Sequence, residues 1–242
     1  MRTSLAQPAP RFPRTAVQEA LAVWAASFLT LLIAFATLPG YAKLVATVTF
    51  LYFPLWAMDR RGEDYADYGV TLRRVKSDLK MFAAFAGVVF PLFVLVFVAF
   101  FQLLPHLPPE LRSLLTPVQG PVAFRPRLPD RFPEWVVDQL FVVALPEEFF
   151  YRGFIQTRLR DAWPQGKVLL GARLGPAFWL TAVLFALGHL AVFEFWRLGV
   201  FFPALLFGWM RERSGTVIAP TLFHASANLL EKVLEASFLG VR

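Results

Sequence analysis

The sequence predicts an all-α fold, a polytopic membrane bundle of seven to eight transmembrane helices. Apolar residues make up 57% of the 242 residues and charged residues 17%, whereas soluble domains average about 45–50% and about 25%. A soluble domain of this length has too little interior to bury 27 Phe side chains. A spanning helix needs about 20 residues, so the chain has room for seven or eight.

The charge balance and the absence of Cys narrow the functional classes. The net charge is +7, which we interpret as loop Lys and Arg that orient the helices in the membrane. We therefore expect the lipid bilayer as a partner and no nucleic acid. Without Cys, disulfides, thiolate catalysis and Cys-ligated metal centres are excluded.

The N-terminal half contains three apolar runs. Residues 1–19 form a polar, basic leader, and residues 20–242 are expected to form one integral membrane domain. The first run, Ala20–Leu38, exceeds the roughly 7–15 apolar residues of a signal peptide, so we predict a retained helix. Further spans are predicted at Tyr41–Met58 and Met81–Leu104.

The C-terminal half follows a Pro-rich segment. Residues 105–133 contain so many prolines that we expect no helix there. Four more spans are predicted at about residues 134–160, 176–193, 196–210 and 216–238.

The distribution of basic residues predicts the orientation. With seven spans and each Lys and Arg assigned to one side, 16 of the 24 fall on the side of the N-terminus and 8 on the other. Basic residues concentrate in cytoplasmic loops. We therefore predict a cytoplasmic N-terminus and a multi-pass protein of the bacterial inner membrane.

Polar residues inside the predicted spans are candidates for function, because an ionisable group there costs about 2.5–3.5 kcal/mol. They lie on three of the spans and comprise Glu147, Glu148, Arg152, His189, His224 and Asn228. Measured from the span midpoints, Glu147, His189 and His224 fall within about 5 Å of one plane. We therefore expect them to meet in a single cavity.

Helical spacing separates the two adjacent carboxylates. Glu148 and Arg152 are four residues apart and can pair on one face. Glu147 is turned by about 100°, which leaves its carboxylate free to act as a base. His224 and Asn228 also share a face. Taken singly, each of these residues also has a structural explanation as a bond between helices.

Three motifs occur in order on successive spans: EExxxR, FxxxH and HxxxN. They are carried by Glu147, Glu148 and Arg152, by Phe185 and His189, and by His224 and Asn228. In residues 134–238 the chain thereby resembles the CPBP family, also called Abi, of intramembrane glutamic endopeptidases, which includes the type 2 CAAX prenyl proteases.

The resemblance implies a role for each position. Glu147 would be the general base that activates water, assisted by His189. His224 and Asn228 would form the oxyanion hole. Such a set supplies the base, the oxyanion donors and the proton that peptide hydrolysis needs.

The same resemblance implies that Glu148 and Arg152 support the site and that no cofactor takes part. A zinc site remains an alternative, because Glu147, His189 and His224 are all of ligand types that zinc accepts.

The expected substrate is a peptide or protein with a membrane-associated C-terminal segment, which is lipidated in the CAAX proteases. Bacterial relatives act in bacteriocin immunity or, as myxosortase-like enzymes, on C-terminal sorting signals. A non-catalytic immunity protein that binds a peptide in the same cavity is the alternative. A transporter is a third hypothesis, against which stands the lack of paired broken-helix repeats.

Overall fold

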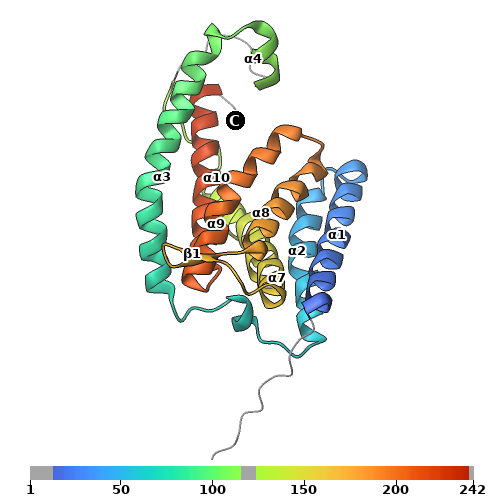
Figure 1. The fold of residues 1–242 in the computed structure, drawn as a ribbon. Coiled ribbons are helices and arrows are strands. Elements are labelled where there is room, and N and C mark those ends of the chain that lie inside the picture. Colours follow the sequence, from blue (N-terminus) through green and yellow to red (C-terminus); the bar gives the residue numbers. More distant parts are fainter. Residues whose placement is uncertain (1–12, 116–123, 240–242) are drawn as a thin grey trace, which may run out of the picture.

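The fold is an all-α bundle, as predicted. The computed structural model describes residues 13–115 and 124–239, so most of the predicted leader lies outside the described residues. Helices account for nearly all regular structure in these ranges, and one two-stranded hairpin accompanies them (Figure 1).

The first three helices are α1 (Pro13–Thr37), α2 (Ala42–Asp59) and α3 (Val75–Leu103). They coincide with the three predicted spans, but α1 begins seven residues early, inside the predicted leader, and α3 begins six residues early. The start of α3 is earlier than predicted, because its first turns accommodate the polar residues that precede Met81.

Among the described residues, two segments are long and apolar enough to cross a membrane by themselves, Thr15–Thr37 and Val75–His106. Only 6% of the apolar window in Val75–His106 is buried inside the protein. An apolar helix that exposes its side chains to the surroundings suits a lipid environment. The segment Pro176–Val192 is a shorter apolar helix.

The expectation that the Pro-rich segment contains no helix was wrong. A 3₁₀ turn (Leu104–His106) and a short helix, α4 (Pro109–Leu115), lie within it. Pro109 is the first residue of α4, where proline is tolerated because its missing N–H has no partner in the helix anyway.

The fourth predicted span is a single continuous helical rod, but it is not uniformly α-helical. It consists of α5 (Phe132–Val137), a π-helical stretch (Asp138–Ala144), α6 (Leu145–Glu148), a second π-helical stretch (Phe149–Ile155) and α7 (Gln156–Ala162). π-Helical turns are rare and frequently lie at functional sites. Here they flank the two adjacent glutamates.

The C-terminal helices differ in detail from the prediction. The remaining elements are α8 (Pro176–Gly188), 3₁₀ helices at His189–Val192 and Phe195–Val200, α9 (Phe201–Ser214) and α10 (Ile218–Leu239). A hairpin of β1 (Lys167–Leu169) and β2 (Ala172–Leu174) joins α7 to α8. The sequence analysis predicted no strands in this connection. Each strand of the hairpin has only three residues.

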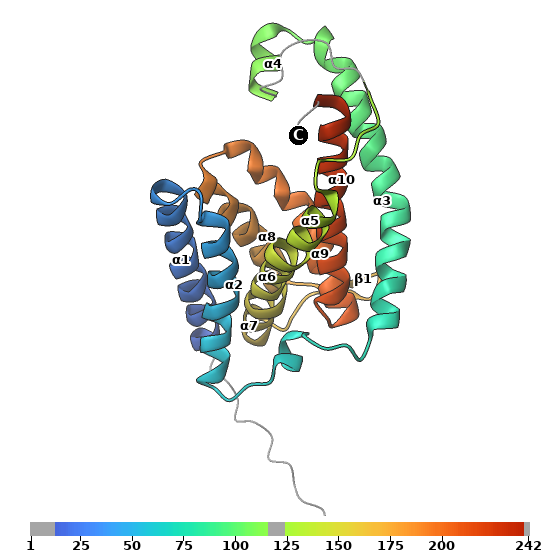
Figure 2. The same ribbon diagram turned by 180° about the vertical axis from the view of Figure 1, so that it is seen from behind.

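The helices cross the bundle in alternating directions. The connection from α2 to α3, the hairpin and the turn from α9 to α10 lie towards the lower end in Figure 1, whereas α4 and the end of α10 lie at the upper end (Figures 1 and 2). This alternation is the one expected of consecutive membrane spans. Which end faces the cytoplasm remains a prediction.

A buried polar network ties the lower end together. Glu19 of α1 accepts a hydrogen bond from Nε of Arg158 on α7, at 2.8 Å, and also pairs with Arg61. Arg61 Nε donates to Glu63 at 2.8 Å, and its Nη2 contacts the hydroxyl of Tyr68 at 3.0 Å. Burial, with the hydrogen bond to Glu63, raises the pKa of Tyr68 to about 12.

We expect Glu19→Gln to lower the stability of the fold. The side chain of Arg158 is only 4% exposed, and loss of the Glu19 carboxylate leaves Asp161, at 3.3 Å, as a remaining ion-pair partner, at a cost of roughly 1–3 kcal/mol. Thermal unfolding in detergent measures the change. The control is Glu194→Gln, which removes an exposed pair with Arg197 and should shift stability by less than about 1 kcal/mol. Equal midpoints for Glu19→Gln and the wild type would contradict this role.

Tyr68 predicts a loss of stability at alkaline pH. Because folding raises the pKa of its phenol from 10.0 to about 12, its contribution is complete below pH 10 and declines as pH rises towards 12. Unfolding midpoints measured across this range should fall more steeply for the wild type than for Tyr68→Phe. Parallel slopes would mean that the phenol titrates normally in the folded protein.

Candidate active site

A fully buried ion pair lies at the centre of the bundle. Arg152 Nη1 donates to Glu148 Oε1 at 3.2 Å, and neither side chain is exposed. Arg152 Nη2 donates to the carbonyl of Ala204 on α9 at 3.1 Å. The guanidinium carbon lies 4.3 Å from the ring centroid of Phe185 and 5.1 Å from that of Phe207. The predicted pair therefore forms, and it is held by α8 and α9 as well.

His224 of α10 joins the same carboxylate. Its Nδ1 lies 2.9 Å from Glu148 Oε1, and its ring stacks on Phe207 with centroids 4.9 Å apart. A carboxylate only accepts hydrogen bonds when ionised, so Nδ1 of His224 carries a proton in this contact. The contact links α10 to the central rod, and Nε2 is the nitrogen left for a substrate.

Glu147 has different surroundings from its neighbour. Its Oε2 is buried and has no hydrogen-bond partner among the described residues. Its charge interacts with the side chains of His189, Tyr151 and Arg152. Glu148 is thus committed through Oε1 to Arg152 and His224, and Oε2 of each carboxylate is buried without a protein partner in this part of the chain.

His189 lies at a helix end and not at mid-span as the sequence suggested. The α-helix stops at Gly188, and His189 begins the 3₁₀ turn that follows. Its Nδ1 lies 2.9 Å from the carbonyl of Phe185. Since a carbonyl can only accept, the proton resides on Nδ1, and Nε2 of the neutral ring is an acceptor. The ring interacts electrostatically with both Glu147 and His224.

Gly188 allows α8 to approach the central rod. A Cβ atom at this position would overlap the hydroxyl oxygen of Tyr151. On the other side, Trp24 of α1 donates its indole N–H to the carbonyl of Leu184 at 3.0 Å. These contacts fix the end of α8 and, with it, the position of His189.

Asn228 is bound to a residue that the sequence analysis missed. Its Nδ2 donates to Gln139 Oε1 at 2.8 Å, and Gln139 Nε2 donates to Asp138 at 3.2 Å. Asp138 in turn pairs with Lys43 of α2 at 2.5 Å. Gln139 is 6% exposed. A polar residue in an apolar run was the available signal, but it is neutral and stands outside the three motifs.

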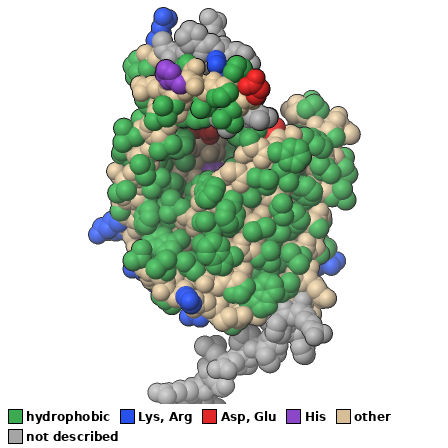
Figure 3. All heavy atoms as spheres, turned by 45° about the horizontal axis from the view of Figure 1, so that its top comes forward, with side chains coloured by type: hydrophobic (Ala, Val, Ile, Leu, Met, Phe, Trp, Pro, Cys, Tyr) green, Lys and Arg blue, Asp and Glu red, His purple; other side chains and the backbone are tan. Residues whose placement is uncertain are grey.

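The structure brings Glu148, Arg152 and His224 into direct contact and places His189 where it interacts with Glu147 and His224. His224 and Asn228 share a face of α10, but the first contacts Glu148 and the second contacts Gln139. Figure 3 shows a hollow that opens towards the upper end of the molecule, with acidic and histidine side chains visible inside it. Within residues 13–115 and 124–239, no group of three or more His, Asp or Glu is arranged to hold a metal ion.

Comparison with known proteins supports the family. Residues 131–230 match the family model described as type II CAAX prenyl endopeptidase Rce1-like. The matched region contains every residue of the three motifs and also Gln139. No curated protein and no solved structure matches the chain significantly. Residues 131–230 are therefore similar to the Rce1-like family of type II CAAX prenyl endopeptidases, whose members are membrane-embedded proteases.

Proposed function

We propose that this protein is an intramembrane endopeptidase in which Glu147 activates water for attack on a peptide carbonyl. The observation that carries the proposal is the unequal environment of two adjacent carboxylates. Glu148 Oε1 is held by Arg152 and His224. Oε2 of both glutamates is buried without a protein partner among the described residues, and Glu147 is the one that interacts with His189. A general base needs such a free oxygen within reach of water.

The hydrolytic step follows from these positions. Glu147 takes a proton from water as the water oxygen bonds to the carbonyl carbon. His189, with its proton fixed on Nδ1 by the Phe185 carbonyl, offers Nε2 to orient that water. When the tetrahedral intermediate collapses, the C–N bond breaks and Glu147 returns the proton to the departing amine. The water thus supplies the hydroxyl group of the new acid and the proton of the new amine, and the step needs no cofactor.

The developing oxyanion requires donors that are already in place. His224 uses Nδ1 for Glu148, so it donates to the oxyanion from Nε2 when the ring carries both protons. Asn228 uses one amide hydrogen for Gln139 and retains a second. We assign these two groups to the oxyanion, with Glu148 and Arg152 as the support of His224.

The substrate we propose is a peptide or protein with a membrane-associated C-terminal segment, in a bacterial inner membrane. The family match supports a CAAX-type endopeptidase. Quenched fluorogenic peptides that end in CAAX, with and without a prenyl group, are suitable probes in proteoliposomes. A preference for the prenylated form would assign the lipidated substrate class.

Glu147→Gln should lower the rate of cleavage of these peptides by about 10²-fold to 10⁴-fold, as expected for loss of a general base. Its unfolding midpoint should stay near that of the wild type, because no protein hydrogen bond to Oε2 is lost. Glu148→Gln is the contrasting variant and should lose stability as well, since it leaves Arg152 buried without its anion.

Retained cleavage by Glu147→Gln would refute the mechanism. If the wild type binds the probe peptides but cleaves none of them, the result would instead favour the non-catalytic binding protein. Loss of wild-type activity with a chelator, and its recovery with zinc, would favour the zinc alternative over a metal-free carboxylate mechanism.

Gln139 should act as a positioning residue for Asn228. Gln139→Leu removes the acceptor of the 2.8 Å hydrogen bond, and we expect kcat to fall by about tenfold or more with little change in KM. Gln139→Glu keeps an acceptor and should restore most of the loss. In an Asn228→Ala background Gln139→Leu should have little further effect, whereas additive losses would contradict a role through Asn228.

A further inference from the structure

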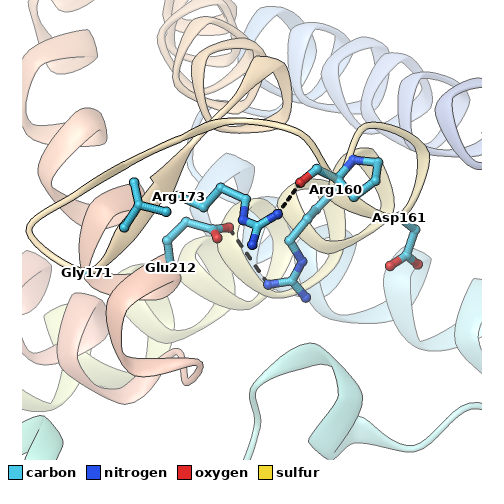
Figure 4. Close-up of a pocket in the computed structure, with 7 residues that line it drawn as sticks. Arg160, Asp161, Gly171, Arg173 and Glu212 are labelled. Carbon is cyan, nitrogen blue, oxygen red and sulfur yellow. Dashed lines mark hydrogen bonds and ion pairs between the residues drawn. The ribbon is translucent and has the colours of Figure 1, made fainter.

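A polar cavity of about 600 Å³ lies at the lower end of the bundle, between the end of α7, the hairpin and α9 (Figure 4). Its lining residues include two arginines, Arg160 and Arg173, and two carboxylates, Asp161 and Glu212. Asp161 pairs with Arg158, outside this lining, at 3.3 Å. Arg160 lies about 20 Å from Glu147 along the helical rod. The cavity is therefore separate from the hydrolytic site.

The positive charge in this cavity is incompletely neutralised. Arg160 Nη1 is 3.8 Å from Glu212 Oε1, and that oxygen already accepts from Gln156 Nε2 at 2.9 Å. Arg173 Nη1 donates to the carbonyl of Pro164 at 2.7 Å, which is a neutral acceptor. Figure 4 shows the two guanidinium groups facing each other across the cavity. Two cations that approach each other in this way favour an anion between them.

A third arginine lies at the hairpin turn. A Cβ atom on Gly171 would be 2.7 Å from Arg213 Nε, so this side chain packs against the turn that lines the cavity. Within the part of the chain that the structure describes, neither Arg173 nor Arg213 has a carboxylate at ion-pair distance. Guanidinium groups bind phosphate oxygens through paired hydrogen bonds, so a phosphate group suits this site.

The hairpin exposes apolar side chains beside the cavity. Val168, Leu169 and Leu170 are 67%, 55% and 78% exposed. Leu170 also has a φ of 50°, a conformation that costs free energy for Leu and that Asn or Gly adopts more readily in such a turn. A water-exposed turn would favour a polar residue here. An apolar tip is favourable among acyl chains.

The hairpin lies at the border of the apolar zone. The carbonyl of Leu169 accepts from the indole of Trp209 at 3.1 Å, and the Trp209 ring is 5.0 Å from that of Phe85 on α3. Phe85 follows Lys80, the last charged residue before the long apolar stretch of α3, by about 7 Å. Trp residues concentrate at this level of a membrane protein, which is also close to the lipid phosphates.

We propose that this cavity binds the headgroup phosphate of a membrane glycerophospholipid, with Arg160 and Arg173 on the phosphate and the tip of the hairpin among the acyl chains of the same leaflet. Lipid is the occupant because the guanidinium groups and the exposed apolar tip adjoin each other. Free inorganic phosphate would match the guanidinium groups but not the apolar tip. The proposal does not depend on the hydrolytic function.

Native mass spectrometry of the full chain in detergent, titrated with phosphatidylglycerol, tests this site. The wild type should retain the lipid, and Arg160→Gln/Arg173→Gln should weaken retention by about tenfold or more. The matched control is Arg127→Gln/Arg131→Gln, which removes the same charge at the opposite end and should behave as the wild type. Equal retention by both double variants would overturn the proposal.

Leu170→Asn provides a second test that does not depend on the arginines. Asn tolerates the positive φ, so the unfolding midpoint should be unchanged or higher, while lipid retention should weaken several-fold. An unchanged retention would exclude insertion of the hairpin tip. Displacement of the lipid by excess inorganic phosphate would identify a site for free anions, and would likewise overturn the proposal.

Discussion

The buried pair of Glu148 and Arg152 is the interaction on which the site depends. Burial of two opposite charges is costly unless their remaining hydrogen-bonding groups are satisfied. Here Glu148 Oε1 also meets His224, and the guanidinium reaches the carbonyl of Ala204 and lies over the ring of Phe185. Glu148 Oε2 and Arg152 Nε remain without a protein partner within the described ranges. One ion pair thus joins the central rod to α8, α9 and α10. His189 directly follows α8, and His224 and Asn228 lie on α10.

The same pair sets the difference between the two glutamates. If both carboxylates were free, they would repel each other and compete for one proton. Arg152 and His224 engage the carboxylate of Glu148, and we therefore propose Glu147 as the base. The π-helical stretches on both sides of Leu145–Glu148 change the register of the rod, and this lets residues from more than one turn point to the same interior.

The helices and the charged part of the site could be predicted from the sequence, because both follow from the free energy of transferring side chains out of water. Apolar runs identify helices that face lipid or each other, and ionisable residues such as Glu148 and Arg152 within them are too costly to be incidental. Gln139 was missed because its amide carries no charge and, unlike Asn228, it stands outside the three motifs. The end of α8 before His189 was also missed, since the apolar run continues through the 3₁₀ turn. The helix at Pro109 depends on proline in the first turn, which composition alone does not reveal.

The central claim is that Glu147 activates water and does not itself attack the peptide. Single-turnover cleavage of a CAAX peptide in ¹⁸O-labelled water, followed by mass spectrometry of the product and of the enzyme, separates the two mechanisms. A general base places the label in the new carboxylate of the product and none in Glu147. A label in the Glu147 carboxylate would show a covalent acyl intermediate and would contradict this account.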